Sequence, residues 1–181
     1  GAGDIIAGGK IIDFAGAGTS AAQTVAGLTS GAAYRAYFVA VDASVNANQS
    51  SIYDAGQFTT VDVVAPVVTA MAPANGDVSV SATTTLKLWF NETVVIGTGK
   101  VVIREVATDI IAETLTITAG NASIVTTDGK SVVTITRGAT LSSKKAYYVE
   151  VDGGTFKDVA LNPMAAITGI GAWSFTTKDT V

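Results

Sequence analysis

The sequence predicts an all-β protein built from two antiparallel β-sandwiches in tandem, the first of them incomplete. Apolar and polar residues alternate with a period of two through much of the chain, and β-branched residues are frequent in these segments. Gly, Asn, Asp and Pro separate the segments, as expected for turns between strands. One pattern of residues also occurs twice in the same order, which indicates two related units.

The repeat divides the chain into a first unit at residues 1–61 and a second unit at 62–181. Its matching parts are Leu28 and Leu141, Tyr34 and Tyr147, the Asp-x-x-x-Asn segments at 42–46 and 158–162, and Phe-Thr-Thr at 58–60 and 175–177. A Tyr six residues after a Leu at the start of a sandwich strand usually bonds its hydroxyl to the backbone. We therefore expect Tyr34 and Tyr147 to form structural tyrosine corners.

The second unit contains enough strand signals for a complete sandwich of about seven strands. The predicted strands cover residues 67–71, 84–90, 100–106, 111–118, 131–137, 146–151 and 172–177. The clearest hairpin turn is Asp128-Gly129, because a two-residue turn of this kind needs positive φ angles. Alternation assigns to the core Leu86, Leu88, Phe90, Tyr147, Val149, Val151, Trp173 and Phe175.

The first unit supplies only about four strand segments, at 11–14, 23–28, 34–41 and 52–58. The chain begins Gly1-Ala2-Gly3 without Met or a signal peptide, so we expect a processed or partial form that lacks about three N-terminal strands. The segment 34–41 is apolar on both faces, with Tyr37, Val39 and Val41 on one side. An uncovered edge and face attract another chain. We expect strands from a neighbouring subunit, or from the severed remainder of the same module, to contact these three residues.

Composition excludes several classes of function. Neither Cys nor His is present, so disulfides, the usual zinc sites and the Ser-His-Asp and Cys-His arrangements cannot form. The net charge is −4 and the basic residues form no stripe, which argues against a nucleic-acid partner. The sequence contains no run of about 18 apolar residues, so no membrane span is predicted. Abundant Thr, Val, Ala and Gly favour a secreted bacterial protein.

Acidic side chains near the predicted turns and the junction are candidate metal ligands. Asp42, Asp62 and Asp158 can each offer carboxylate oxygens, and calcium takes six to eight oxygens from carboxylates and carbonyls. An Asp in a turn more often caps its own backbone amides. Capping is therefore the preferred interpretation, calcium is the alternative, and no other cofactor is expected.

Two catalytic interpretations have less support in the sequence than a non-catalytic role. Glycoside hydrolysis needs two carboxylates across a cleft, whereas the glutamates lie on separate strands and turns, at Glu92, Glu105, Glu113 and Glu150. Ser142 and Lys145 have the Ser-x-x-Lys spacing of serine acylases, but the partner motifs of those enzymes are absent. We expect no enzyme activity.

Trp89 is the candidate for contact with a ligand or another protein. Alternation directs Leu88 to the core and turns Trp89 outward with Lys87. An exposed Trp can stack on a sugar ring or anchor a protein contact, unless a neighbouring loop covers it. Tyr148 also faces outward, but its strand is expected in the opposite sheet, so the two aromatic residues should not form one platform.

Several motifs follow one another through the second unit. They are Asp62-x-x-Ala-Pro66, Pro73-Ala-Asn-Gly76, Leu88-Trp-Phe90-Asn-Glu92, the Leu141 to Tyr147 corner, Asp158-x-x-x-Asn162 and Ser174-Phe-Thr-Thr177. With this order, residues 62–178 resemble the bacterial Ig-like domain of surface-layer and other cell-surface proteins. Residues 20–60 resemble the last half of a fibronectin type III-like module. The family usually has Gly just before the turn Asn, where this chain has Val45 and Leu161.

The resemblance implies tandem immunoglobulin-like sandwiches with an extracellular, cell-surface location. It implies a structural role in a surface layer, stalk, adhesin or filament, with self-association as the expected partnership. The alternative is a spacer or carbohydrate-binding module of a large secreted polysaccharide-acting enzyme, for which cell-wall glycan would be the partner. The resemblance implies no reaction.

Overall fold

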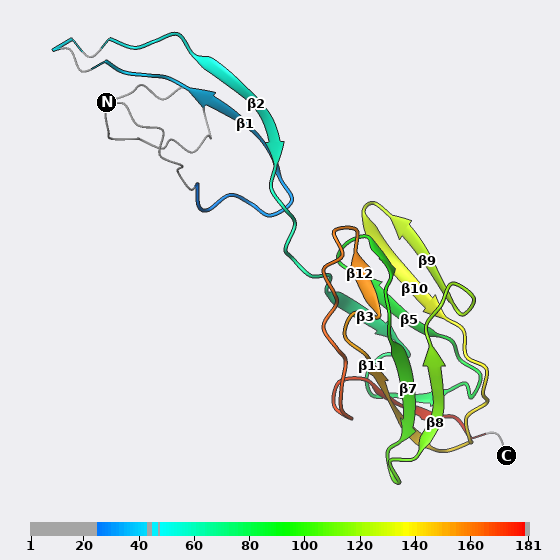
Figure 1. The fold of residues 1–181 in the computed structure, drawn as a ribbon. Helices are drawn as coiled ribbons and strands as arrows, with labels where there is room; N and C mark the ends of the chain where they lie inside the picture. Colours follow the sequence, from blue (N-terminus) through cyan, green and yellow to red (C-terminus); the bar gives the residue numbers. More distant parts are fainter. Residues whose placement is uncertain (1–24, 43–44, 47, 180–181) are drawn as a thin grey trace. The chain divides into compact units, whose positions relative to one another are not determined.

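The computed structural model describes residues 25–42, 45–46 and 48–179, and all regular structure among them is β-strand (Figure 1). The predicted all-β class is confirmed. The chain divides into two compact units, Gly1–Asp62 and Val63–Val181. No helix in the described ranges has the length and apolar character needed to cross a membrane.

The described residues of the first unit form one β-hairpin. Strand β1 (Ala33–Phe38) pairs antiparallel with β2 (Tyr53–Thr59), and a bulge between Ala36 and Tyr37 shifts their register. Beyond the hairpin, Val41 makes only an isolated bridge with Gln49. The predicted strand at 34–41 is therefore too long, because regular pairing stops three residues earlier, at Phe38.

Of the other two strands predicted for the first unit, only the one at 23–28 falls partly on described residues. Residues 25–28 form no strand, and the physical reason is Gly27, whose φ of 76° lies far from the negative φ of an extended strand. The prediction of a strand at 23–28 is wrong over this described part. The segment 11–14 lies outside the described residues.

The second unit is a two-layer sandwich. Its strands are β3 (Val68–Ala72), β4 (Asp77–Val80), β5 (Leu86–Phe90), β6 (Val94–Ile96), β7 (Lys100–Glu105), β8 (Ile111–Thr116), β9 (Ala122–Thr127), β10 (Lys130–Ile135), β11 (Ala146–Val151), β12 (Phe156–Asp158) and β13 (Ser174–Thr177). One sheet has the order β3-β5-β10-β9 and the other β4-β13-β11-β7-β8, while β12 and β6 form a separate short pair. Only β4 and β13 pair in parallel; the other neighbouring strands are antiparallel.

One hydrophobic core joins the two sheets. The eight residues predicted for it from the alternation are all buried, and none is more than 3% exposed. The largest, Trp173, is fully buried and its Nε1 donates a hydrogen bond to the Pro73 carbonyl oxygen at 2.7 Å. No buried side-chain nitrogen or oxygen in the described residues lacks a hydrogen-bond partner. The core prediction is confirmed.

Short strands account for most differences from the predicted pattern in this unit. Strands β6 and β12 have three residues and β4 has four, which is too few to produce a recognisable period of two. The turn at Asp128-Gly129 is confirmed: φ is 51° and 70°, and Thr127 lies opposite Lys130. Strand β9 was anticipated only as one arm of this hairpin.

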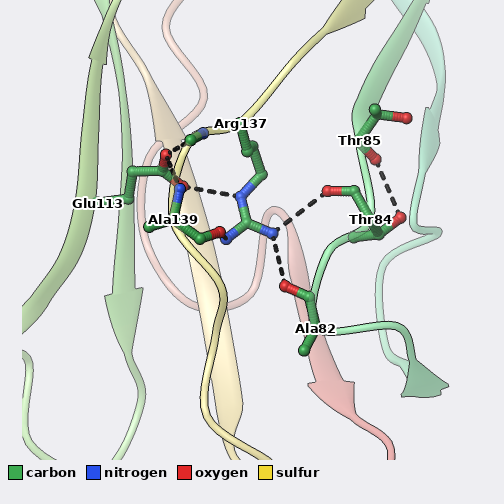
Figure 2. A network of polar contacts seen from close by, with 7 residues as sticks. Ala82, Thr84, Thr85, Glu113, Arg137 and Ala139 are labelled. Carbon is green, nitrogen blue, oxygen red and sulfur yellow. Dashed lines mark hydrogen bonds and ion pairs between the residues drawn. The ribbon is translucent and has the colours of Figure 1, made fainter.

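A buried ion pair lies beside β8 in the second unit. Glu113 points inward from β8, and Arg137, which follows β10, places Nε 2.9 Å from Glu113 Oε2. The two side chains are 8% and 2% exposed. Glu113 Oε1 accepts hydrogen bonds from the N–H groups of the two residues after Arg137, at 2.8 and 2.9 Å. The guanidinium also donates to carbonyl oxygens of Ala82, Thr84 and Ala139 (Figure 2).

Candidate functional site

Both tyrosine corners bond to the backbone in the same way. Tyr34 Oη accepts a hydrogen bond from the Thr29 N–H at 2.8 Å, and Tyr147 Oη accepts one from the Ser142 N–H at 3.1 Å. The hydrogen bond from Thr29 favours the phenolate and lowers the pKa of Tyr34. Each hydroxyl therefore serves the local fold of its own unit.

The end of the Phe-Thr-Thr motif repeats equally closely. Thr60 Oγ1 donates to the Thr29 carbonyl at 2.6 Å and accepts from the Ala32 N–H at 2.9 Å. Thr177 Oγ1 donates to the Ser142 carbonyl at 2.7 Å and accepts from a backbone N–H at 3.0 Å. The sequence repeat is thus a repeat of hydrogen bonds.

The preceding Phe of each motif lies beside the corner tyrosine. Tyr34 is opposite Phe58 with ring centroids 5.8 Å apart, and Tyr147 is opposite Phe175 with centroids 6.2 Å apart. The hairpin β1-β2 of the first unit is therefore the structural equivalent of the β11-β13 pair in the second.

Equivalent side chains in the two strand pairs, β1-β2 and β11-β13, differ in burial. Phe58 is 43% exposed and Phe175 is 2% exposed. Four residues after each corner tyrosine, Phe38 is 49% exposed and Val151 is 1% exposed. In the second unit β7 and β4 flank this pair, whereas the described part of the first unit supplies neither neighbour. The uncovered face of β1 and β2 is the main candidate interaction surface.

The predicted contact residues lie on and after β1. Tyr37 and Val41 are exposed, and Val39 is half-buried. The guanidinium carbon of Arg35 lies 5.9 Å from the centroid of the Tyr37 ring, and Arg35 also pairs with Asp54. That ion pair lowers the pKa of the Asp54 carboxyl. Arg35 and Tyr37 lie on the face of β1 opposite to Phe38, so this second face of the hairpin carries an exposed ion pair beside an aromatic ring.

The predicted calcium ligands make capping hydrogen bonds. Asp158 accepts bonds from both the N–H and the Nδ2 of Asn162, each at 2.7 Å, and Asp42 accepts the same two bonds from Asn48 at 3.0 Å. The predicted turn partner at position 46 is wrong, because the turn in the first unit is two residues longer. Asp62, the last residue of the first unit, accepts a hydrogen bond from Ser30 Oγ at 2.9 Å.

Sequence reasoning did not include Glu92 among the candidate ligands. Its carboxylate lies within 4.8 Å of that of Asp158, which is fully buried at the end of β12. The signal was available, since Glu92 follows β5 in the Leu-Trp-Phe-Asn-Glu motif. Two carboxylates supply fewer oxygens than calcium needs, so carbonyl or water oxygens would have to complete the shell. Calcium binding at Asp42, Asp62 and Asp158 stays a prediction.

The other glutamates weighed for catalysis are engaged in ion pairs. Glu105 pairs with Lys145 at 2.6 Å and Glu150 with Arg104 at 3.2 Å, while Glu113 belongs to the buried network. The pair with Glu105 raises the pKa of the Lys145 ammonium, which therefore stays protonated at neutral pH and is unsuited to act as a general base.

Two surface hollows of the second unit do not gather carboxylates. A depression of about 310 Å³ is lined by Val68, Met71, Ala166, Ile167, Thr168 and Ala172. A second, of about 240 Å³, has Glu105 as its one acidic lining residue. In the part of the chain that the structure describes, neither hollow brings together the two acidic groups that glycoside hydrolysis requires.

Trp89 lies half-buried on the outer face of β5. It is opposite Ala70 of β3 and Val132 of β10, and Val132 is in turn opposite Val125 of β9. These four residues form an apolar row that crosses the whole sheet. Lys87 lies in the next row, opposite Thr134.

Tyr148 is in the other sheet, as expected, but it is buried rather than exposed. Its side chain is 7% exposed, and its hydroxyl donates to the Asp109 carboxylate from the loop after β7. That hydrogen bond, burial and the nearby negative charges together raise the pKa of Tyr148. The loop covers a side chain whose strand position alone predicted exposure.

Comparison with known families gives one match. A family model described as a bacterial Ig-like domain matches residues 62–177, which is well over half of the chain and includes both sheets of the sandwich. Neither the curated proteins nor the solved structures contain a match. The fibronectin type III-like character of the first unit stays a prediction. The two-layer β-sandwich and the matched residues show that this chain belongs to the bacterial Ig-like domain family.

Proposed function

We propose that this chain is a structural, non-catalytic part of an extracellular bacterial assembly, in which strands of another polypeptide complete the first unit. The observation that carries the proposal is the exposure of Phe38 and Phe58, whose equivalents in the second unit are buried. An isolated two-stranded hairpin is at best marginally stable in water. Burying one large apolar side chain under an added strand stabilises the completed unit by roughly 1.5 to 3 kcal/mol.

The second unit indicates how the added strands would pair. There, β7 runs antiparallel beside β11, and β4 runs parallel beside β13. By equivalence, one added strand pairs antiparallel with β1 and another parallel with β2. Their inward side chains cover Phe38 and Phe58, and main-chain hydrogen bonds provide much of the affinity, as in other cases of strand addition. A neighbouring subunit of a surface layer, stalk, adhesin or filament, or the remainder of the same module, can supply them.

The experiment compares association of the full chain and its variants by sedimentation velocity. Phe38→Asp and Phe58→Asp place a charge on the face to be covered and should abolish association through the first unit. Val45→Asp is the matched control, because Val45 is fully exposed in a turn of the same unit. A monomer whose β1 and β2 amides are protected from hydrogen exchange would show that the unit closes without a partner.

Trp89 supports a second candidate function, a carbohydrate-binding or spacer module of a large secreted polysaccharide-acting enzyme. A half-buried indole in the middle of a sheet face can stack on a sugar ring, and Lys87 and Thr134 can donate hydrogen bonds beside it. The test is binding to insoluble cell-wall polysaccharide. Trp89→Ala should lose that binding, whereas Tyr53→Ala, which removes an exposed aromatic residue of the first unit, should retain it. Equal binding by both variants contradicts this alternative.

A further inference from the structure

Strand β9 is an unprotected edge of the four-stranded sheet. It lies outermost beside β10, which is its one neighbour in that sheet (Figure 1). Natural edge strands usually carry charges, proline, bulges or a short length that prevent pairing with another chain. The six residues of β9, Ala-Ser-Ile-Val-Thr-Thr, include no charge and no proline, and their pairing with β10 has no bulge.

The other edges of the two large sheets carry such protection. Strand β3 has a bulge against β5 and lies between Pro66 and Pro73. Strand β8 has a bulge in its pairing with β7 and carries the inward-pointing charge of Glu113. Strand β4 has only four residues, and Ser79 within it has a φ of 60°. The contrast singles out β9 as the edge open to pairing.

The hairpin turn determines which backbone groups of β9 are free. In a two-residue hairpin the flanking pair, here Thr127 and Lys130, exchanges hydrogen bonds, and every second residue does the same. The bond from the Thr136 N–H to the Asn121 carbonyl at 2.8 Å agrees with this count. The N–H and C=O groups of Ile124 and Thr126 therefore point away from β10, and they make no hydrogen bond within the described residues.

We propose that β9 pairs with β9 of a second copy of this chain, antiparallel about a two-fold axis at Val125. In this register Ile124 of one copy lies opposite Thr126 of the other, so that their free N–H and C=O groups pair on each side of the axis. The two copies of Val125 face each other as a non-hydrogen-bonded pair, in which side chains approach most closely. The result is one continuous sheet that spans both copies.

A second copy fits this edge for two reasons. The apolar row of Ala70, Trp89, Val132 and Val125 ends at Val125, which is 63% exposed, and a two-fold axis there joins it to the same row of the partner. Identical strands also repel one another if they carry charges, and this chain has a net charge of −4. Because β9 is uncharged, two copies meet there without like charges opposite one another.

The first test is disulfide cross-linking of single-cysteine variants of the full chain, which contains no native cysteine. Opposed residues of a non-hydrogen-bonded pair have Cα atoms about 4.5 Å apart, within the range that a disulfide spans. Val125→Cys should form dimers under mild oxidation roughly tenfold faster than Val78→Cys, because pairing raises the effective thiol concentration. Val78 is a matched control, since it is 73% exposed on the protected edge strand β4. Equal rates overturn the proposal.

The second test exchanges charges at the two-fold axis. Val125→Lys and Val125→Glu should each weaken association of the full chain by roughly tenfold, because like charges then oppose each other. An equimolar mixture of the two should restore it through Lys–Glu pairs. Tryptophan fluorescence checks that the fold is retained. Unchanged association of both variants overturns the proposal.

These outcomes are separate from those of the proposed function. Phe38→Asp and Phe58→Asp should leave the cross-linking of Val125→Cys unchanged, because they lie in the other unit. If these two variants abolish association and Val125→Lys does not, the contact between copies belongs to the first unit. That result would overturn the pairing of β9. A wild-type chain that stays monomeric at every concentration also overturns it.

Discussion

Removing the guanidinium of Arg137 should be among the most damaging single substitutions in the second unit. Arg137→Met retains an apolar stem but leaves the Glu113 carboxylate, 8% exposed, without its counter-charge. Breaking a buried ion pair by removing one partner costs about 3–5 kcal/mol. The three carbonyl oxygens that accept from the guanidinium also lose a donor. The cost is a large part of the roughly 5–15 kcal/mol by which a domain is stable.

Urea unfolding followed by tryptophan fluorescence measures this cost in the full chain. Both tryptophans, Trp89 and Trp173, belong to the second unit, so the signal reports on that unit. With a denaturant slope of about 2 kcal/mol per molar, a loss of about 4 kcal/mol lowers the midpoint by about 2 M. Arg104→Met is the control, because its pair with Glu150 is about a third exposed and should contribute about 1 kcal/mol or less.

A double variant separates the ion pair from the packing of its parts. Arg137→Met combined with Glu113→Leu removes both charges together, so it should cost clearly less than the sum of the single substitutions. The reasoning is refuted if Arg137→Met costs less than about 1 kcal/mol, the value of an exposed pair. Strict additivity of the two substitutions would refute it as well.

Four further predictions follow from single features of the chain. Leu161 is 65% exposed and has a φ of 73°, so Leu161→Gly should stabilise the second unit by about 0.5–1 kcal/mol, and an unchanged urea midpoint would contradict this. The pKa of Tyr148 is raised by its bond to Asp109, so its contribution to stability is complete below about pH 10 and is lost as the pH rises through the folded-state value. Melting temperatures of the wild type should therefore fall more steeply above pH 10 than those of Tyr148→Phe, and parallel curves would argue against it. Residues 62–178 should fold alone, giving a β-type circular dichroism spectrum and cooperative melting; a disordered or helical spectrum would rule this out. If calcium binds near Asp158, it should raise the melting temperature of the wild type but not of Asp158→Asn, and the absence of calorimetric heat with unchanged melting in chelator would exclude it.

The sequence by itself determined the features that depend on neighbouring positions along the chain. Alternation in residues 86–90 and 146–151 placed the core side chains correctly, because successive side chains of a strand point to opposite faces. Asp128-Gly129 identified the hairpin turn, since its φ angles are a local requirement. The repeat of Leu, Tyr and Phe-Thr-Thr identified two related units, because the corner bonds join residues within one short motif.

Only the tertiary structure decided which groups surround each side chain. The ion pair of Glu113 and Arg137 joins residues 24 positions apart, and the direction of Glu113 could not reveal its partner. Tyr148 is buried by a loop that carries Asp109, although its strand position turns it away from the core. Glu92 and Asp158 come together because Asp158 of β12 lies opposite Val94 of β6, two residues after Glu92. Local patterns encode the direction of a side chain, whereas its environment depends on packing between segments that are distant in sequence.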